Sequence, residues 1–275
     1  GAVMSVAWLW GILLVGATVL LAVAGTLLAR RWVSVEILKL NNEVAGFIYA
    51  VIGVLYAVLL GFTAIIVWEQ FDKAQAGVDQ EANELADLYR HAQAFPDDTR
   101  RALETQLRAY AKLVVEKEWP AMVERTSSSE TWEMYSPETW EMYNQLWRTY
   151  QQFQPQNDHE RIWYAESLTR MSQLGDQRRL RLLSSRSEGI PAVMWVALLG
   201  AGGVTIGFSF LFGTRSAVAQ VLMTSGLAMT IAVVLLSIVA LEEPFRGITR
   251  VDPGAFDQLA YIFDVWSQAG VGQSR

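Results

Sequence analysis

Residues 44–68 read VAGFIYAVIGVLYAVLLGFTAIIVW, an unbroken apolar stretch without a charged side chain. About twenty apolar residues, at 1.5 Å of rise per residue, match the roughly 30 Å thickness of the hydrocarbon core of a bilayer. A backbone inside lipid must satisfy its own hydrogen bonds, which a helix does. We therefore expect this stretch to be a membrane-spanning helix.

Three other stretches have a similar length and composition, and they lie at Ala7–Ala29, Ile190–Phe212 and Ala217–Leu241. The first is too long for the apolar region of a signal peptide and is followed by Arg30 and Arg31, so we expect it to be retained. Together the four stretches predict an all-α membrane protein with four transmembrane helices. The last two are close enough in sequence to form a tight antiparallel hairpin.

The polar sequence between the second and third spans predicts a helical-bundle soluble domain inserted there. The second span continues as a polar helix to about Gln93, where Phe95-Pro96 ends it, and Asp98 is the expected N-cap of the next helix. Trp119-Pro120 should disturb that helix. Further helices are expected at about Pro137–Phe153 and from the following turn to Gly189, and no strand is expected.

These elements divide the chain into four parts. Residues 5–69 hold the first two spans, 70–188 the soluble domain, 189–241 the last two spans, and 242–275 a C-terminal tail. A loop of about fourteen residues, Arg30–Glu43, connects the first two spans.

Composition excludes several classes of function. The formal net charge of −6 argues against nucleic acid as a partner, and without cysteine there is no disulfide framework, Fe–S cluster or Cys-ligated zinc. His91 and His159 are the only histidines, and we interpret both as ordinary residues of the soluble domain. We expect no cofactor and no metal, and membrane lipid as one partner.

Sequence motifs for catalysis are missing as well. The chain has no phosphate-binding glycine loop, no His-Glu-x-x-His and no nucleophile elbow, so we do not expect an enzyme. The four spans also lack the carboxylates and lysines with which coupled transporters bind protons or ions at mid-membrane. A passive pore needs neither.

An octapeptide is duplicated in the soluble domain, as Glu130–Pro137 and then Glu138–Gln145. The duplication brings five aromatic residues close together in the sequence, namely Trp132, Tyr135, Trp140, Tyr143 and Trp147. These side chains either pack into the helical domain or form an aromatic docking surface for a partner, and the sequence leaves both interpretations open.

Small residues recur every four positions in two spans. Such spacing lets helix backbones approach closely where lipid provides no hydrophobic drive for association. The positions are Gly46 with Ala50, then Gly53, Ala57 and Gly61 in the second span, and Gly203 with Gly207 in the third. The close approach is either within one subunit or between symmetry-related helices around an axis.

Two short motifs resemble bestrophin channels. Val58–Phe62 followed by Ile65–Phe71, with Trp68 and Gln70, is similar to the second transmembrane helix of bestrophins, which carries Leu-Gly-Phe, an aliphatic run and Trp-x-Gln-aromatic. After the fourth span, Pro244, Phe245 and Gly247 resemble the Pro-Phe-Gly segment with one residue inserted.

The whole chain further resembles the bacterial family described as bestrophin-like. The elements that carry this resemblance are Asn41–Phe47, Glu118-Trp119-Pro120 and Glu243–Gly247. The order of elements also matches that of bestrophins, with two spans, a helical domain, two spans and a tail.

This resemblance implies a homopentamer with a central pore lined by the second helices. Carried onto this sequence, the hydrophobic neck consists of Val54, Val58 and Phe62, which share one helix face, while Gly53 and its repeats lie about 100° away. A narrow apolar ring can close a pore by dewetting. The acidic calcium-binding cluster of bestrophins has no counterpart after Gly247, so calcium gating is not implied.

Charged residues at the domain-side membrane edge give opposing indications of ion selectivity. Acidic rings favour cations, and the candidates are Glu69, Asp72, Glu242 and Glu243. A basic group before the third span could instead favour anions, and it contains Arg178, Arg179, Arg181 and Arg186. Interfacial anchoring and solvated helix faces are the simpler interpretation of all eight. We lean slightly to monovalent cations over chloride.

The basic residues also bear on orientation in the membrane. Arg30, Arg31 and Lys39 favour a cytoplasmic first loop, whereas the basic residues around the third span and the bestrophin layout favour a cytoplasmic domain. We expect a multi-pass protein of the bacterial inner membrane with its soluble domain in the cytoplasm.

Two hypotheses from different functional classes follow. The first is a pentameric passive ion channel, with inorganic ions as its cargo. The alternative is a non-conducting membrane scaffold or sensor that binds a partner through its Trp-rich helical domain.

Overall fold

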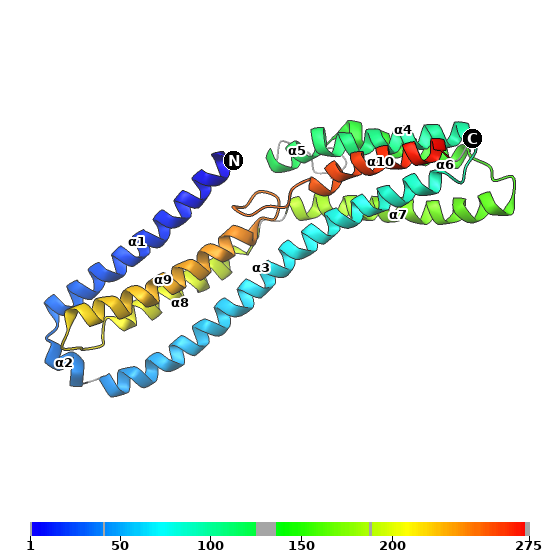
Figure 1. Cartoon of the computed structure of the whole chain (residues 1–275). Coiled ribbons are helices and arrows are strands. Elements are labelled where there is room, and N and C mark those ends of the chain that lie inside the picture. The colour runs from blue at the N-terminus through cyan, green and yellow to red at the C-terminus, as the bar shows by residue number, and fades with distance from the viewer. Residues whose placement is uncertain (1, 41, 125–135, 187–188, 273–275) are drawn as a thin grey trace. The chain divides into compact units, whose positions relative to one another are not determined.

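The structure is a computed structural model of the whole chain, and it describes residues 2–40, 42–124, 136–186 and 189–272. All regular secondary structure in these ranges is helical, and no strand occurs in them, which confirms the expected all-helical class (Figure 1). The helices are α1 (Ala2–Trp32), α2 (Val35–Leu40), α3 (Asn42–Ala92), α4 (Asp97–Leu113), the π-helix η1 (Val114–Glu118), α5 (Trp119–Glu124), α6 (Pro137–Gln152), α7 (Asp158–Ser185), α8 (Ala192–Ser209), α9 (Ala217–Glu242) and α10 (Gly254–Gly272).

Four of the described helices, α1, α3, α8 and α9, are long and apolar enough to cross a membrane, judged by length and composition. The apolar stretches 7–29, 44–68 and 217–241 lie within α1, α3 and α9, whereas the stretch 190–212 begins two residues before α8 and ends three residues after it. α3 is a single helix of 51 residues that runs from its apolar half into a polar half, as the lack of a breaker before Phe95-Pro96 indicates. The connection from α1 to α3 differs from the expected loop, because α1 extends to Trp32 and Val35–Leu40 forms α2.

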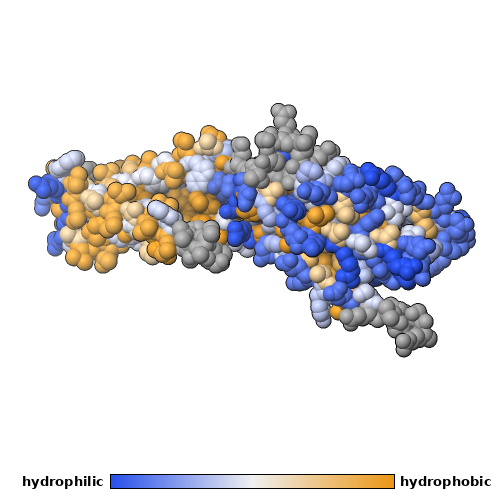
Figure 2. Space-filling view, turned by 90° about the horizontal axis from the view of Figure 1, so that it is seen from above, coloured by the Kyte–Doolittle hydropathy of each residue, from blue (hydrophilic) through white to orange (hydrophobic). Residues whose placement is uncertain are grey.

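The chain divides into two compact units, each described by itself. The first unit comprises residues 1–71, 188–243 and 247–249. Its core is built where Tyr56, Leu60 and Val67 of α3 pack with Leu198 of α8 and with Ile231 and Ile238 of α9. α1 packs along α9 (Figure 1). Apolar residues, in orange, dominate the view of this unit in Figure 2, whereas hydrophilic residues, in blue, dominate the view of the second unit.

Polar side chains hold the short connection between α8 and α9. The Asn42 side chain donates from Nδ2 to the carbonyl of Gly213 and accepts at Oδ1 from the Gly213 amide, both at 2.9 Å. Arg30 donates from Nη1 to Oε1 of Gln220 at 2.6 Å and to the carbonyl of Thr214 at 3.1 Å. The starts of α3 and α9, the end of α1 and the hairpin loop are thereby joined.

The second unit comprises residues 72–187, 244–246 and 250–275. The expected tail contains α10, which packs on α4 and on the polar half of α3. Phe263 stacks on Tyr89 with ring centroids 4.3 Å apart, and Asp264 accepts from Arg108 Nη1 at 2.6 Å. The last helix of the chain is therefore part of the folded polar unit.

Side chains cap the starts of α6, α7 and α9, whereas α4 and α8 begin after a proline without such a cap. α6 begins with Ser136 as N-cap, which accepts from the amide of Thr139, and α7 begins with Asn157, which accepts from the amide of Glu160. The prediction of Asp98 as an N-cap is wrong. α4 begins at Asp97 after Pro96, and the Asp98 carboxylate instead pairs with Arg101 at 3.1 Å.

The disturbance expected at Trp119-Pro120 takes the form of the π-helix η1, one turn before the proline. Proline lacks an amide donor and its ring clashes with the carbonyl four residues earlier, which a widened turn relieves. α7 ends at Ser185, short of the expected Gly189. Gly189 has φ of +72°, a left-handed conformation that favours glycine.

We expect Asn42→Ala to destabilise the first unit by about 1–3 kcal/mol, because it leaves a partly buried amide and carbonyl of Gly213 without their partners. Thermal unfolding of the detergent-purified full chain, followed by circular dichroism, measures the effect. Gln75→Ala is the matched control, since Gln75 is bonded only to Asp79 one turn along the same helix. Equal losses in the two variants would contradict the assigned role of Asn42.

Candidate functional site

The three residues of the expected neck lie together on an exposed face of α3. Val54 is 64% exposed, Val58 51% and Phe62 64%. Tyr56 and Leu60, each two positions from a neck residue, are buried in the core of the first unit. Two residues along a helix are about 200° apart, so the neck face is opposite the face that binds α8 and α9.

The small residues on α3 and α8 are open as well. A Cβ atom built on Gly53, Gly61, Gly203 or Gly207 would meet no atom within 4 Å, apart from its own helix backbone and immediate neighbours. On Gly46 it would meet only Phe212, at 3.9 Å, and Ala57 is exposed. These positions therefore do not form close helix contacts within the described chain.

The four candidate acidic residues differ in their surroundings. Glu69 and Asp72 are exposed on α3. Glu242 is engaged locally, since its Oε1 accepts from the backbone amide of Ile190 at 2.9 Å and from Nε1 of Trp195 at 3.0 Å. Glu242 thus ties the end of α9 to the start of α8, and Glu243, also partly buried, is the C-cap of α9.

The residues of the two family motifs also have distinct roles. Trp68 and Gln70 are exposed on α3. Phe245, 1% exposed, meets Trp119 edge-on at 5.7 Å, and Pro244 accepts from the amide of Val251 at 2.7 Å. Gly247 lies where a Cβ would come within 2.8 Å of the carbonyl oxygen of Ala240, so the turn after α9 requires a glycine.

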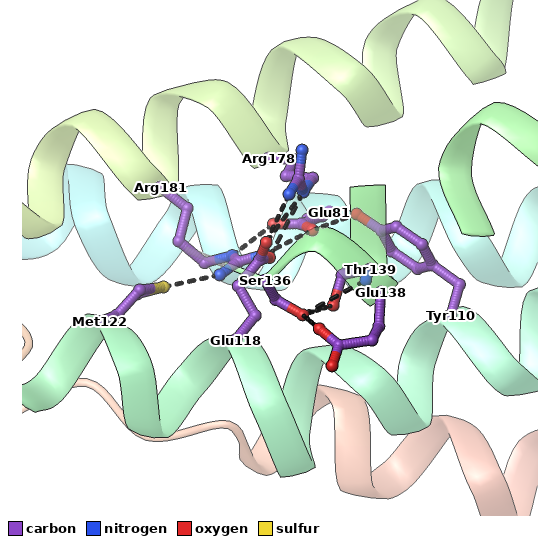
Figure 3. Close-up of polar contacts among 9 residues, drawn as sticks. All are labelled: Glu81, Tyr110, Glu118, Met122, Ser136, Glu138, Thr139, Arg178 and Arg181. Carbon is purple, nitrogen blue, oxygen red and sulfur yellow. Dashed lines mark hydrogen bonds and ion pairs between the residues drawn. The ribbon is translucent and has the colours of Figure 1, made fainter. Parts of the chain in front are cut away.

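Four buried charged side chains lie together in the core of the second unit (Figure 3). Arg178 of α7 donates from Nη2 to Oε1 of Glu118 at 2.5 Å, and Arg181 donates to Oε2 of the same carboxylate at 2.7 Å. Arg181 also pairs with Glu81 of α3 at 2.7 Å, and the hydroxyl of Tyr110 donates to Glu81 at 3.0 Å. We call Glu81, Glu118, Arg178 and Arg181 the ion cluster.

Opposite charges decide the protonation states inside the ion cluster. Burial raises the pKa of the Glu118 carboxyl, but Arg181 and Arg178 lower it by more, so its pKa lies below the usual value. Burial lowers the pKa of Arg181, and Glu81 and Glu118 raise it by more. Glu118 and Arg181 are therefore both charged, and each faces an opposite charge within the cluster.

The expectation that Arg178 and Arg181 are interfacial or solvated residues is wrong, since they are 1% and 2% exposed. On α7 every third or fourth residue is buried, and this series contains Met171, Leu174, Arg178, Arg181 and Ser185. This heptad-like spacing, which begins with two apolar residues, is the sequence signal for the burial of the two arginines. The sequence does not predict that Glu81 and Glu118 are buried and paired with arginines. Glu118-Trp119-Pro120 is, however, one of the family elements. Burial of Glu118 and Trp119 accounts for that element.

The second copy of the octapeptide packs into the same unit. Tyr143 is buried, donates to the carbonyl of Met171 at 3.1 Å, and stacks with Trp140 at 5.8 Å. Trp147 meets Tyr143 edge-on at 6.4 Å. Trp132 and Tyr135 lie outside the described residues. Tyr143 is thus part of the core, and Trp140 and Trp147 pack on it while remaining partly exposed.

Both histidines contact Trp163 of α7, and His159 belongs to α7 itself. His91 is buried, with Nδ1 3.4 Å from Oγ of Ser167 and its ring edge-on to Trp163 at 4.9 Å. His159 accepts at Nε2 from Nε1 of Trp163 at 3.2 Å. Within the described parts of the chain, no three His, Asp or Glu side chains are placed to hold a metal ion.

The described residues form helices only, and four of these helices are long and apolar enough to span a membrane. This is the architecture of an α-helical membrane protein. The family model of the bestrophin-like domain matches residues 16–256. The chain belongs to the bestrophin-like family, as the sequence motifs indicate.

Solved structures show the same fold. A mutant of a bacterial bestrophin homologue from Klebsiella pneumoniae superposes with a TM-score of 0.68 at 13% identity, covering 90% of this chain and 98% of that one. Another crystal structure of the Klebsiella pneumoniae homologue gives 0.63 at 14% identity, with 90% and 96% covered. A protein described only as a membrane protein gives 0.66 at 14% identity, with 90% and 97% covered. None of the curated protein sequences matches this chain.

We expect Glu118→Gln to destabilise the second unit by about 3 kcal/mol or more, because two buried guanidinium groups lose half of their compensating charge. The measurement is denaturant unfolding of the purified full chain, followed by tryptophan fluorescence. Glu141→Gln is the control, since its exposed pair with Arg148 contributes at most about 1 kcal/mol. A loss no larger than that of the control would overturn the importance of the ion cluster.

We expect the second unit to lose stability as the pH falls below about 6.5. Burial lowers the pKa of His91, against the raising effect of Asp87 and Glu166, so folding favours the neutral ring. This stabilisation is present above the unfolded pKa and is lost as the pH falls through the folded one. Unfolding midpoints between pH 7.5 and 5 should depend less on pH in His91→Gln, with exposed His159→Gln as control. An unchanged pH dependence in His91→Gln would refute the assignment.

Proposed function

We propose that this chain is a subunit of a homopentameric, passive ion channel. In this proposal the four apolar helices cross the bacterial inner membrane, and residues 70–188 form a soluble domain on the cytoplasmic side. Five copies of α3 surround the pore, and Val54, Val58 and Phe62 form its hydrophobic neck. The channel performs no catalysis and needs no cofactor.

One observation carries the proposal. α3 has a buried face that binds its own chain and an opposite face, including the neck residues, that is more than half exposed. Small residues with open space beside them, Gly53 and Gly61, lie next to that face. A neck directed to a shared axis and a glycine edge directed to a neighbouring α3 would use both surfaces.

We keep the slight preference for monovalent cations over chloride, and it rests mainly on Glu69 and Asp72. Glu69 and Asp72 are exposed and can form acidic rings in a symmetric assembly, whereas Glu242 is engaged with Ile190 and Trp195. Arg178 and Arg181 are neutralised in the ion cluster, so they offer no basic ring for anions. Arg179 and Arg186 remain on the domain side before the third span, so these two residues and the family layout support the cytoplasmic side of the domain.

The scaffold alternative has less support. It requires an accessible aromatic surface around the duplicated octapeptide, and Tyr143 is buried with Trp140 and Trp147 packed on it. We therefore propose the channel and treat a non-conducting particle as an outcome of its test.

We expect Phe62→Ala to raise single-channel conductance several-fold in planar bilayers, because a wider and less apolar neck stays wet. The full chain is purified, reconstituted and recorded in a KCl gradient, whose reversal potential gives the sign of the permeant ion. Leu21→Ala is the control, since Leu21 lies on α1 and is 73% exposed.

A current that does not change in Phe62→Ala, or that changes equally in Leu21→Ala, would refute the neck. Absence of current in every variant would favour the scaffold. Electron microscopy of the purified particle tests the assembly independently, because a monomer or dimer has no shared central axis for five helices.

A further inference from the structure

A cavity of about 340 Å³ opens between three apolar helices of the first unit. Its walls come from α1, through Leu14 and Thr18, from α8, through Trp195, Leu199 and Gly203, and from α9, through Leu235 among others. No residue of α3 lines the cavity, so it does not include the neck residues. It is therefore distinct from the proposed pore.

The wall offers nothing to a polar ligand. Thr18 and Trp195 alone among the lining residues carry polar side-chain atoms. The Thr18 hydroxyl donates to the carbonyl of Leu14 at 2.9 Å, and the indole N–H of Trp195 donates to Glu242. Both are satisfied inside the protein, so an occupant gains only by burying apolar surface.

The cavity is too small to take a whole helix inside it. A helix about 10 Å across occupies roughly 1,200 Å³ over 16 Å of its length, several times the volume of the cavity. Lining residues on α8 extend from Trp195 to Ile206, which is about 16 Å of helix. This length matches the depth of one leaflet, about half of the roughly 30 Å hydrocarbon core. The space is long, thin and apolar.

One end of the cavity has the chemistry of a membrane interface. Trp195 lines the cavity, and its polar edge is bound to the carboxylate of Glu242, which also caps the amide of Ile190 before α8 begins. Tryptophan is enriched where hydrocarbon meets headgroups. An occupant can thus have a polar end beside Trp195 and an apolar chain along α8.

We propose that this cavity binds one acyl chain of a membrane phospholipid. The assignment rests on the proposal that α1, α8 and α9 cross the membrane, but not on ion conduction. Recognition is through the chain, so lipids that differ only in headgroup bind alike.

Two glycines of α8 provide a matched test. Gly203 lines the cavity and has open space where a side chain would start, whereas Gly200 has the same open space but does not line it. Gly203→Leu fills the cavity and Gly200→Leu does not. Gly202 is unsuitable, because a Cβ there would come within 2.6 Å of the Tyr56 hydroxyl.

Native mass spectrometry of the delipidated full chain measures binding of palmitoyl-oleoyl phosphatidylglycerol or phosphatidylethanolamine. We expect wild type and Gly200→Leu to retain one lipid per chain of either type, and Gly203→Leu to retain at least fivefold less. Leu199→Trp fills the cavity from its exposed rim and should show the same loss if Gly203→Leu fails to fold. Soluble glycerol phosphate should not bind.

Equal retention by the variants that fill the cavity and by wild type would overturn the assignment. A wild type that retains no lipid would overturn it as well. Resistance of the expressed protein to alkaline carbonate extraction reports membrane insertion separately, so loss of that premise is distinguishable from loss of the site.

Discussion

The structure depends on α3 keeping one face against its own chain while the opposite face has no partner there. Tyr56, Leu60 and Val67 fix the rotation of the helix about its axis, because each is buried against α8 or α9. Once that rotation is fixed, Val54, Val58 and Phe62 must point away. A helix that is equally apolar on all sides could pack in any rotation about its axis. In α3 the buried Tyr56 and the open Gly53 and Gly61 make the sides different from one another.

A second constraint governs the polar unit. Four charges taken out of water cost several kcal/mol each unless opposite charges and hydrogen bonds compensate them. Here Glu118 bridges both arginines and Glu81 completes the balance, while the Tyr110 hydroxyl occupies a remaining carboxylate lone pair. The compensation requires η1, α3 and α7 to be placed together. The arrangement thus favours one packing of these helices over others that would separate the charges.

Sequence reasoning succeeded where a single physical rule dominates. Apolar length located α1, α8, α9 and the first half of α3, and the lack of a breaker predicted the continuation of α3 to Ala92. It failed where two rules compete. Arginine is usually solvated, which predicts an exposed Arg178 and Arg181. Their spacing from Met171 and Leu174 instead places them on the buried face of α7. Burial prevails because both guanidinium groups have carboxylate partners there.

Other features could not be predicted from local patterns. The engagement of Glu242 with Trp195 joins residues 47 positions apart in sequence, and Asp264 of α10 contacts Arg108 of α4 across 156 positions. The neck residues follow from the family motifs rather than from a local pattern, and all three are exposed on α3.

Mutual compensation in the ion cluster limits how its members can change during evolution. A substitution of Glu118 leaves two buried guanidinium groups without this carboxylate. Such a change is therefore tolerated only if Arg178 or Arg181 changes at nearly the same time. Among diverged relatives these positions should therefore covary as a set, either all ionic or all replaced by apolar residues of similar volume. Lineages of the second kind would keep the bundle with no charge at these four positions.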